Sequence, residues 1–384
     1  MPDTASSTGR PANGVLSDPE PSDRTGTPPA TSAAEPAAQH YPSFGRRLAK
    51  ALSFRNISAL YLFVAMCAIF ALWIPTTFLT TGTWRSLLAN QSITCLVALA
   101  LVVPLASGVF DLAVGSEVGL GAILSAWLLV NKGLPIALAV LLALAAGAVV
   151  GVFVAFLIVK ARINSFIATL GVSSVLVALI SWISDQQQIL NVPPDYSKIA
   201  TGQLFGIVYP VYYLLIVAFI LWYVLERTAI GRRVYATGGN PDAAALAGVR
   251  TSRVILGATI TCGVICGLAG LLVTSQLTAG DPTIGPGYLL PAIAAAVLGS
   301  TQLRGGRYNV WGTVIAAYVL ATGVKGLQLA GAPVWIPELF NGLALLIAVG
   351  MAQLQRSPAA AGTSVIQRLF RRTNLRTQPE NSPI

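Results

Sequence analysis

The chain has few charged residues for its length. Only 10% of its 384 residues are Asp, Glu, Lys or Arg, whereas an average soluble protein carries about 25%. A surface that faces water on all sides cannot be built from so few charges, so the composition excludes a soluble globular enzyme. The net charge of +10 is therefore interpreted through membrane topology, and we expect no nucleic-acid partner.

Histidine and cysteine are also scarce. The single histidine, His40, lies in a polar N-terminal segment, so the apolar part of the chain has no histidine base and no H-E-x-x-H metal site. The four cysteines lie in apolar runs and do not indicate a disulfide framework. Cys262 and Cys266 share one helical face, but no carboxylate or histidine accompanies them in the sequence. We therefore interpret them as small buried residues and expect no bound metal.

The sequence also lacks a nucleotide-binding loop. No stretch matches G-x-x-x-x-G-K-[ST], the pattern whose backbone amides hold phosphates. No pairing of a nucleophile with a base is evident from spacing either. We therefore expect no catalytic residues and no cofactor bound by this chain.

Apolar residues are abundant instead. They make up 55% of the chain, and the mean hydropathy is +0.72. A membrane-crossing helix needs about 20 mostly apolar residues, and ten segments approach this length, of which the third and eighth are unusual. The fold class is thus an all-α polytopic membrane protein. The predicted spans are 57–75, 86–107, 112–130, 134–159, 163–184, 207–225, 254–278, 288–303, 310–330 and 334–351.

Three domains follow from the composition. Residues 1–47 are rich in Pro, Ala, Ser and Thr, and they lack the apolar surface that would offset their ordering entropy. We predict a disordered tail there, a membrane domain over residues 48–355, and a basic C-terminal tail over residues 356–384. Glycine pairs four residues apart, Gly147 with Gly151 and Gly263 with Gly267, predict close packing of helix backbones.

The basic residues orient the spans. With the N-terminus in the cytoplasm, the inner segments from Arg46 onward hold eighteen Lys and Arg residues, and the outer segments hold only Arg85, Lys132 and Lys198. Basic residues concentrate on the cytoplasmic side of membrane proteins. An even number of spans returns the chain to the same side, so we expect both termini in the cytoplasm.

Two segments interrupt the apolar pattern in the same way. Residues 107–117 read SGVFDLAVGSE, and residues 279–288 read AGDPTIGPGY. Each has an Asp four residues before a Gly, at an offset of 170 residues. The offset leads from the third predicted span to the eighth. Because this is an odd step of five spans, the two spans cross the membrane in opposite directions. The pattern is consistent with an inverted repeat of spans 2–5 and 7–10.

These interruptions predict broken or re-entrant helices. Gly and Pro release backbone groups that have to face protein or a water-filled cavity rather than lipid. An ionisable residue at membrane depth indicates a polar pathway, although Asp111 at an interface would equally serve as a cap for the following helix. The candidate pathway residues are Asp111, Gly115, Ser116, Glu117, Asp281, Pro282 and Gly285.

The longest inner segment between spans covers residues 226–253 and predicts a short helix outside the membrane. We expect a turn over 238–241, with Asn240 as cap and Pro241 as the first helical residue. Asp242 then suits the positive end of the helix dipole, and Gly248 ends the helix. The candidate docking residues are Gly238, Gly239, Asn240, Pro241, Asp242, Ala243, Ala244 and Gly248.

From about residue 55 to residue 352 the chain resembles a known family, the inner-membrane permease subunits of ribose-type bacterial ATP-binding-cassette (ABC) sugar importers. The resemblance rests on five stretches in fixed order: SGVFDLAVGS (107–116), INSFIATLG (163–171), GRRVYATGGNPDAAALAGV (231–249), TSQLTAGDPTIGPGYLLPAIAAAVLGS (274–300) and GGRYNVWGT (305–313). It implies a multi-pass protein of the bacterial inner membrane whose loop at 239–248 contacts the ATPase.

The resemblance also implies partners. These are a second permease copy, two ABC ATPase subunits that use ATP, and an external solute-binding protein that delivers a small neutral solute such as a monosaccharide. Two other classes remain as alternatives. An ion-coupled secondary transporter would use Asp111 and Glu117, and a membrane-embedded enzyme would need a base that the sequence does not supply.

Overall fold

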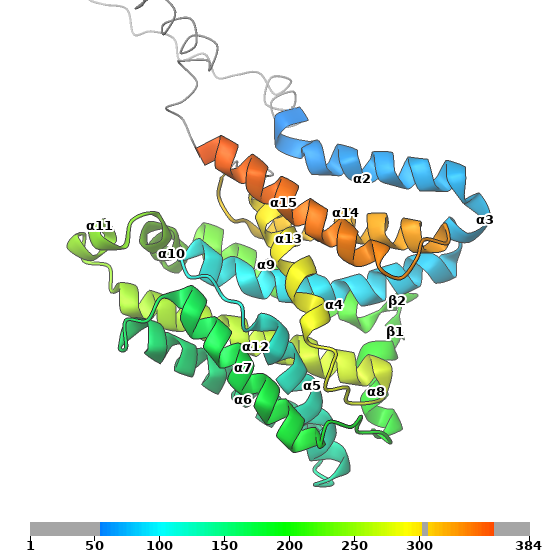
Figure 1. Ribbon diagram of the computed structural model, residues 1–384, viewed down its shortest axis with the longest axis horizontal. Coiled ribbons are helices and arrows are strands. Elements are labelled where there is room, and N and C mark those ends of the chain that lie inside the picture. The colour runs from blue at the N-terminus through cyan, green and yellow to red at the C-terminus, as the bar shows by residue number, and fades with distance from the viewer. Residues whose placement is uncertain (1–53, 302–305, 357–384) are drawn as a thin grey trace, which may run out of the picture. The chain divides into compact units, whose positions relative to one another are not determined.

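The computed structural model describes residues 54–301 and 306–356, with side chains described for residues 61–301 and 306–350. Within these ranges the backbone is almost entirely helical (Figure 1). The predicted tail at 1–47 lies outside the described residues, as does the predicted C-terminal tail after Arg356. The disorder of residues 1–47 stays a prediction.

Ten apolar helices match the ten predicted spans, which confirms the all-α polytopic fold class. Their boundaries differ from the predicted ones by at most five residues. They are α2 (Phe54–Trp73), α4 (Thr81–Ala106), α5 (Val114–Val130), α6 (Ile136–Val159), α7 (Ser165–Ser184), α9 (Tyr209–Arg227), α12 (Thr251–Leu277), α13 (Pro286–Thr301), α14 (Val310–Leu329) and α15 (Ile336–Arg356).

Six of these helices are long and apolar enough to cross a membrane, and four have shorter apolar stretches. Among the shorter ones, α5 has 17 residues and α13 has 16. At 1.5 Å per residue they are each about 25 Å long, less than the 30 Å of a bilayer core. They are the third and eighth predicted spans, and both are short because a non-helical segment precedes them.

The segments between the spans contain structure that the sequence analysis did not predict. The helix α3 (Pro75–Phe78) follows α2, and α8 (Pro194–Thr201) precedes a small antiparallel hairpin of β1 (Gln203–Leu204) and β2 (Ile207–Val208). Tyr196 of α8 is fully buried, and its hydroxyl donates a hydrogen bond to the Leu271 carbonyl at 3.0 Å. This contact fixes α8 on α12.

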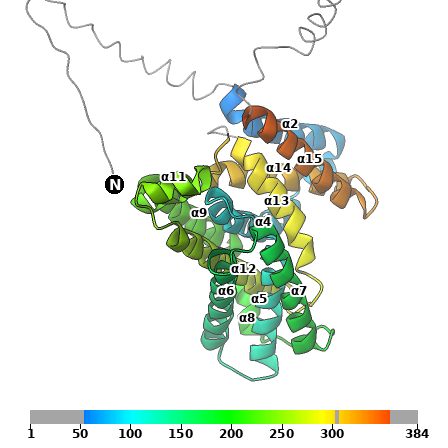
Figure 2. The ribbon, with the colours of Figure 1, turned by 60° about the vertical axis from the view of Figure 1, so that its left-hand side comes forward.

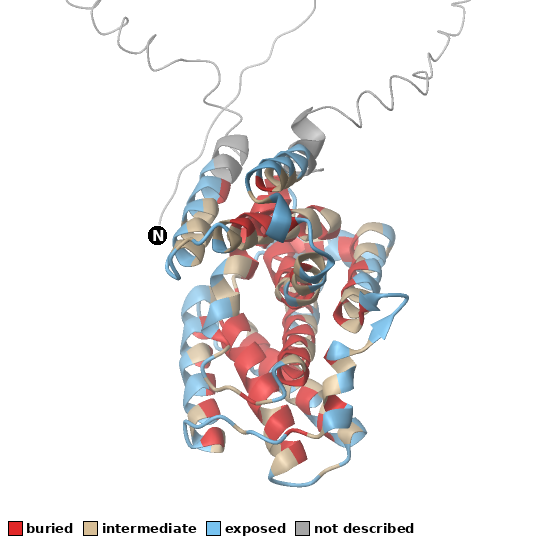
Figure 3. Ribbon diagram, turned by 90° about the vertical axis from the view of Figure 1, so that its right-hand side faces the viewer, coloured by how far each residue is buried: buried red, intermediate tan, exposed pale blue. Residues whose placement is uncertain are grey.

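Buried residues gather in helices at the centre of the membrane domain (Figure 3). The helices with the most buried residues are α4, α5 and α12. In Figure 2, α5 and α12 lie among α6, α7 and α8, in agreement with the contacts between these helices. The predicted glycine packing is present between α6 and α12. A Cβ on Gly147 would lie 2.2 Å from the Gly263 carbonyl oxygen, and the Thr259 hydroxyl donates to the Gly151 carbonyl at 2.8 Å.

Large apolar side chains cover the outer faces of α6, α7 and α9. Leu141, Ile167, Trp182 and Phe219 are each more than half exposed. Apolar side chains exposed in this number on helices of membrane-spanning length are expected to face lipid or another membrane protein.

Candidate functional site

The first helix interruption covers residues 107–113, between α4 and α5. Its backbone amides are satisfied by α7, because the Phe110 N–H donates to the Ser165 hydroxyl at 3.3 Å and the Leu112 N–H to the Thr169 hydroxyl at 3.1 Å. The Asp111 side chain is buried, and its Oδ1 accepts the Ala113 N–H at 2.9 Å. The polar groups of this interruption are therefore held by protein, as a membrane interior requires.

Asp111 is not the interfacial cap that the sequence left open. The residue at the cap position of α5 is Ala113, which makes no side-chain cap hydrogen bond. The Asp111 carboxylate bonds to the N–H of Ala113 itself, in a turn that precedes the helix. Asp111 is only 1% exposed. It is an internal turn residue rather than a surface cap.

The second interruption covers residues 278–285, between α12 and α13. Gly280 forms an antiparallel backbone bridge with Ile189, and both of its hydrogen bonds measure 2.9 Å. Asp281 Oδ1 accepts the Thr283 N–H at 2.8 Å, and its Oδ2 accepts the Gln188 side-chain amide at 3.1 Å. Pro282 lies in the turn that follows. This interruption is thus tied to the segment between α7 and α8.

The two interruptions have the same local geometry. In each, an Asp carboxylate accepts the N–H two residues ahead, and the two pairs are separated by the predicted offset of 170 residues. The glycines that follow meet each other. A Cβ on Gly285 would lie 2.4 Å from the Gly115 carbonyl oxygen, and a Cβ on Gly115 would lie 3.0 Å from the Gly285 carbonyl oxygen. Reciprocal contact between equivalent residues is expected beside a pseudo-two-fold axis.

The contacts between helices also repeat between the two halves of the membrane domain. With α4, α5, α6 and α7 paired to α12, α13, α14 and α15, the contact of α6 with α12 corresponds to that of α14 with α4. The contact of α5 with α7 likewise corresponds to that of α13 with α15. The packing therefore agrees with the predicted inverted repeat of spans 2–5 and 7–10.

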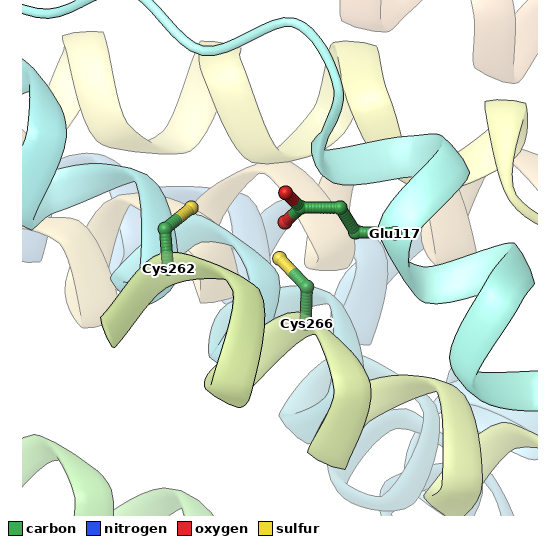
Figure 4. Close-up of side chains that lie close together, drawn as sticks. All are labelled: Glu117, Cys262 and Cys266. Atoms are coloured by element: carbon green, nitrogen blue, oxygen red, sulfur yellow. The ribbon is translucent and has the colours of Figure 1, made fainter. Parts of the chain in front are cut away.

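Ser116 and Glu117 point in different directions from the start of α5. The Ser116 hydroxyl is hydrogen-bonded to the Ser173 hydroxyl of α7. Glu117 points between Cys262 and Cys266 of α12 (Figure 4). The interpretation of these cysteines as unaccompanied by a carboxylate was therefore wrong. Glu117 is 145 residues before Cys262 in the chain, so no local spacing indicated the approach.

The candidate pathway residues do not line either of two cavities found in the described part of the chain. The smaller cavity, of about 200 Å³, lies among α4, α13, α14 and α15, and the sequence analysis missed it. Carboxamide side chains within apolar spans were the sequence signal for this cavity, because burying such a group without a hydrogen-bond partner costs free energy. Its polar lining consists of Ser86, Asn90, Gln91, Thr94, Lys325, Gln328 and Asn341.

Two of these carboxamides are already oriented by hydrogen bonds. The Gln91 amide donates to the Ala317 carbonyl at 3.0 Å, and Gln276 of α12 donates to the Asn90 side-chain oxygen. The cavity, here called the carboxamide cavity, therefore presents neutral donors and acceptors together with the ammonium of Lys325.

The larger cavity has a volume of about 760 Å³ and lies among α9, α10 (Ala229–Gly239) and α12. Apolar side chains such as Leu221 and Val254 form part of its wall. Arg233, Arg250 and Arg253 add positive charge to it.

The predicted extramembrane helix is present as α11 (Pro241–Leu246), at the left edge of Figure 1. Asn240 Oδ1 accepts the Ala243 N–H at 2.9 Å, Pro241 is the first helical residue, and Asp242 lies in the first turn. Gly248 has a φ of +83° and donates to the Ala245 carbonyl at 2.9 Å. The predicted cap and stop are confirmed.

One part of the loop prediction was wrong. Gly238 and Gly239 are the last residues of α10 and not part of a turn. The helix continues to Gly239 because Gly238 packs on the end of α4, beside the first interruption, where a Cβ would lie 2.2 Å from the Ala106 carbonyl oxygen. The chain leaves the helix only at Asn240, whose extended backbone is favoured by the proline that follows.

Exposure divides the docking candidates. Ala244 is buried, whereas Gly238, Gly239, Asn240, Pro241, Asp242, Ala243 and Gly248 are exposed. Leu246, which the sequence analysis did not select, is 92% exposed at the end of α11. Leu246 is therefore accessible to a partner protein.

Comparison with known proteins gives the family. The family described as branched-chain amino acid transport system / permease component matches residues 83–349. The ribose import permease protein RbsC of Haemophilus influenzae is 31% identical over 300 residues, which cover 77% of this chain and 91% of that protein. No solved structure matches the chain.

Two further relatives carry the names of other sugars. The D-allose transport system permease protein AlsC of Escherichia coli is 29% identical over 304 residues, covering 79% of this chain and 93% of its own length. The fructose import permease protein FrcC of Rhizobium meliloti is 30% identical over 293 residues, covering 74% and 81%. With its apolar helices, this chain therefore belongs to the family of transport-system permease components and is a multi-pass membrane protein.

Proposed function

We propose that this chain is the membrane-spanning subunit of an ABC importer for a small neutral solute, most simply a monosaccharide such as ribose, xylose or galactose. A separate ATPase supplies the energy, and an external binding protein delivers the solute. The named substrates of the relatives (ribose, allose and fructose) support this class of cargo. In this proposal the chain binds neither ATP nor any other cofactor.

The observation that carries the proposal is the helix α11. It is capped at both ends and ends in Leu246, which is 92% exposed. A loop with a merely connecting role has no need of a capped helix outside the apolar spans. Arg232 and Arg250 belong to the same inner segment as this exposed leucine, so the segment suits a partner surface that combines an apolar pocket with acidic residues. We infer that each ATPase grips α11 in this way.

Motion of α11 has a direct route to the membrane core. The backbone of Gly238, at the end of α10, packs on Ala106 and Gly108 at the first interruption, and α10 is followed immediately by α11. We infer that closure of the ATPase moves α10 and α11 together and displaces residues 107–113. For ATP to drive this motion, the assembled transporter needs two global conformations, and its ATPase subunits need to bind ATP with different affinity in each.

The carboxamide cavity supports a cargo that forms many hydrogen bonds. Amide and hydroxyl groups recognise a polyhydroxyl solute through paired donors and acceptors, and Lys325 adds a cationic donor to the wall. Its residues lie at the starts of α4 and α15 and at the end of α14, which are the outer ends if both termini are cytoplasmic. We infer that the cavity belongs to the outer half of the pathway, with Asp111 and Asp281 supporting the interruptions rather than touching the solute.

The assembly follows from the same reasoning. Exposed apolar side chains on α6, α7 and α9 are available to the lipid bilayer and to a second copy of the chain. We propose a homodimer with two ATPase subunits in the bacterial cytoplasmic membrane, with both termini of each copy in the cytoplasm.

Docking is tested by co-purification of the chain with a candidate ABC ATPase subunit. We expect Leu246→Glu to abolish co-purification, because it places a charge where the partner groove is apolar. Phe205→Glu is the matched control, since Phe205 is also 92% exposed but lies in the hairpin turn between β1 and β2. Unchanged co-purification of Leu246→Glu would refute the docking role of α11.

Transport is tested in proteoliposomes that contain the permease, the ATPase and the binding protein. We expect solute accumulation that requires internal ATP and resists a protonophore, and we expect none from the permease alone. Uptake that collapses with a protonophore at constant ATP would favour the ion-coupled alternative through Asp111 and Glu117. Asn341→Leu should lower uptake while leaving ATPase co-purification unchanged, because it removes a carboxamide from the cavity only.

A further inference from the structure

A carboxylate and two thiols meet inside the membrane domain, where α5 crosses α12. Cys262 and Cys266 are 0% exposed, and Glu117 is 2% exposed. One ligand atom of each residue, two sulfurs and one carboxylate oxygen, lie within 4.8 Å of one another. Figure 4 shows the Glu117 carboxylate reaching across from α5 towards the two sulfurs. We call these three residues the Glu117 cluster.

Both carboxylate oxygens of Glu117 lack a hydrogen-bond partner within the described part of the chain. Asp111, six residues earlier, differs because its Oδ1 accepts the Ala113 N–H. A buried carboxylate that is neither paired nor hydrogen-bonded costs several kcal/mol. The two oxygens of Glu117 therefore need a partner outside the described hydrogen bonds, either a proton or a bound cation.

No Lys or Arg among the described residues forms an ion pair with Glu117. A proton would neutralise the carboxyl group and leave the two thiols without a role. A divalent cation would use all three side chains at once. Sulfur ligands four residues apart on one helix face, completed by a carboxylate, form a donor set that favours zinc over magnesium or calcium.

We propose that Glu117, Cys262 and Cys266 bind a zinc ion that ties the start of α5 to the middle of α12. The two thiols lose their protons on binding, and three anionic ligands around a divalent ion leave a single net negative charge. Glu117 lies in the first turn of α5, where the helix dipole favours negative charge.

Tetrahedral zinc brings its ligand atoms to about 3.5 Å from one another. The three atoms, which lie within 4.8 Å of one another, therefore need to approach by about 1 Å at most, and we expect rotation of the cysteine and glutamate side chains to supply this.

The cluster is enclosed, because none of its three residues is more than 2% exposed. An ion would thus enter while the helices assemble and would leave slowly. For this reason the test supplies metal during expression, and a chelator added afterwards is not expected to remove it.

The test measures metal in the full-length chain, purified in detergent from cells grown with added zinc. Inductively coupled plasma mass spectrometry should find about one zinc ion per chain. The double variant Cys262→Ala with Cys266→Ala should hold at least about tenfold less, and Glu117→Gln should also lose zinc. Cys95→Ala is the matched control, because Cys95 is equally buried but lies outside the cluster, and it should keep its zinc.

A second measurement keeps the proposal testable if the double variant fails to fold. The native chain expressed with cobalt should show thiolate-to-cobalt charge-transfer absorption, and its X-ray absorption spectrum should contain both sulfur and oxygen ligands. A monodisperse native chain that carries no zinc and takes up no cobalt would overturn the proposal. So would a Cys262→Ala, Cys266→Ala variant that keeps the full metal content.

Discussion

The two helix interruptions use one local device in two different surroundings. In both, an Asp accepts the N–H two residues ahead, before a glycine that packs on its counterpart. Asp111 is 1% exposed and lies beside Glu117 and the thiols of α12. Asp281 is partly exposed and binds Gln188. Repetition of the sequence therefore reproduced the backbone turn, while the surroundings of each turn diverged.

The interruptions also connect to different parts of the molecule. The first contacts Gly238 at the end of α10, next to α11. The second is bridged to Ile189 in the segment between α7 and α8. In the orientation we propose, with both termini in the cytoplasm, these contacts lie on opposite sides of the membrane. One interruption is then suited to receive motion from the proposed ATPase, and the other to respond to events at the outer surface.

The largest expected effect is at the glycine crossing where the two interruptions meet. Gly285→Ala places a Cβ 2.4 Å from the Gly115 carbonyl oxygen, whereas Gly115→Ala places one 3.0 Å from the Gly285 carbonyl oxygen. We expect Gly285→Ala to cost about 3 kcal/mol and Gly115→Ala to cost less. Thermal unfolding in detergent measures both, with Gly171→Ala, which meets no neighbour within 4 Å, as control. Equal stability of all three variants would contradict the crossing.

The second largest expected effect is at the contact between α10 and the first interruption, which a pair of adjacent glycines tests. Gly238→Ala places a Cβ 2.2 Å from the Ala106 carbonyl oxygen, whereas Gly239→Ala meets nothing within 4 Å. We expect the first variant to lose about 2 kcal/mol of stability and most ATP-driven uptake, and the second to behave as the native chain. Transport and thermal unfolding assays measure both variants. Equal uptake and equal stability of the two would contradict the route through α10.

The third effect compares the two aspartates. Asp111→Ala leaves the Ala113 N–H without its partner in a buried turn, a loss of about 1–3 kcal/mol. Asp281→Ala frees an N–H in a partly exposed turn, where water replaces the carboxylate, so its cost should be smaller. Melting temperatures of the two variants check the order. Native stability and uptake in Asp111→Ala would show that the buried turn tolerates the loss.

The smallest effect is a dependence on pH at the second interruption. Burial raises the pKa of Asp281, but hydrogen bonds from Thr283 and Gln188 outweigh it and hold the pKa below its ordinary value. A depressed pKa gives stability that is present above the unfolded value of about 3.9. That stability is lost as the pH falls through the lower folded value.

We therefore expect the difference in melting temperature between the native chain and Asp281→Asn to be constant near neutral pH and to shrink in acid. Gln188→Ala should reduce the same difference, because it removes one of the hydrogen bonds to the carboxylate. A difference that grows as the pH falls would mean that the Asp281 pKa is raised and not lowered.

Local chemistry predicted much of this protein. Hydropathy located all ten apolar helices, and the Asn240, Pro241 and Gly248 signals located α11, because span length and helix caps depend on neighbouring residues only. The 170-residue offset also located both interruptions. The prediction failed at Gly238, whose helical conformation depends on packing against Ala106, a contact that no local pattern contains.

By itself the sequence determined that the chain enters a membrane, where its helices break and which short helix stands outside the spans. The tertiary structure decided which distant groups meet. It brought Glu117 between Cys262 and Cys266, collected the carboxamides of α4, α14 and α15 around one cavity, and set Gly115 against Gly285. The physical reason is that apolar helices of similar composition pack in many ways, and the choice depends on close backbone contacts and buried polar groups between residues far apart in the chain.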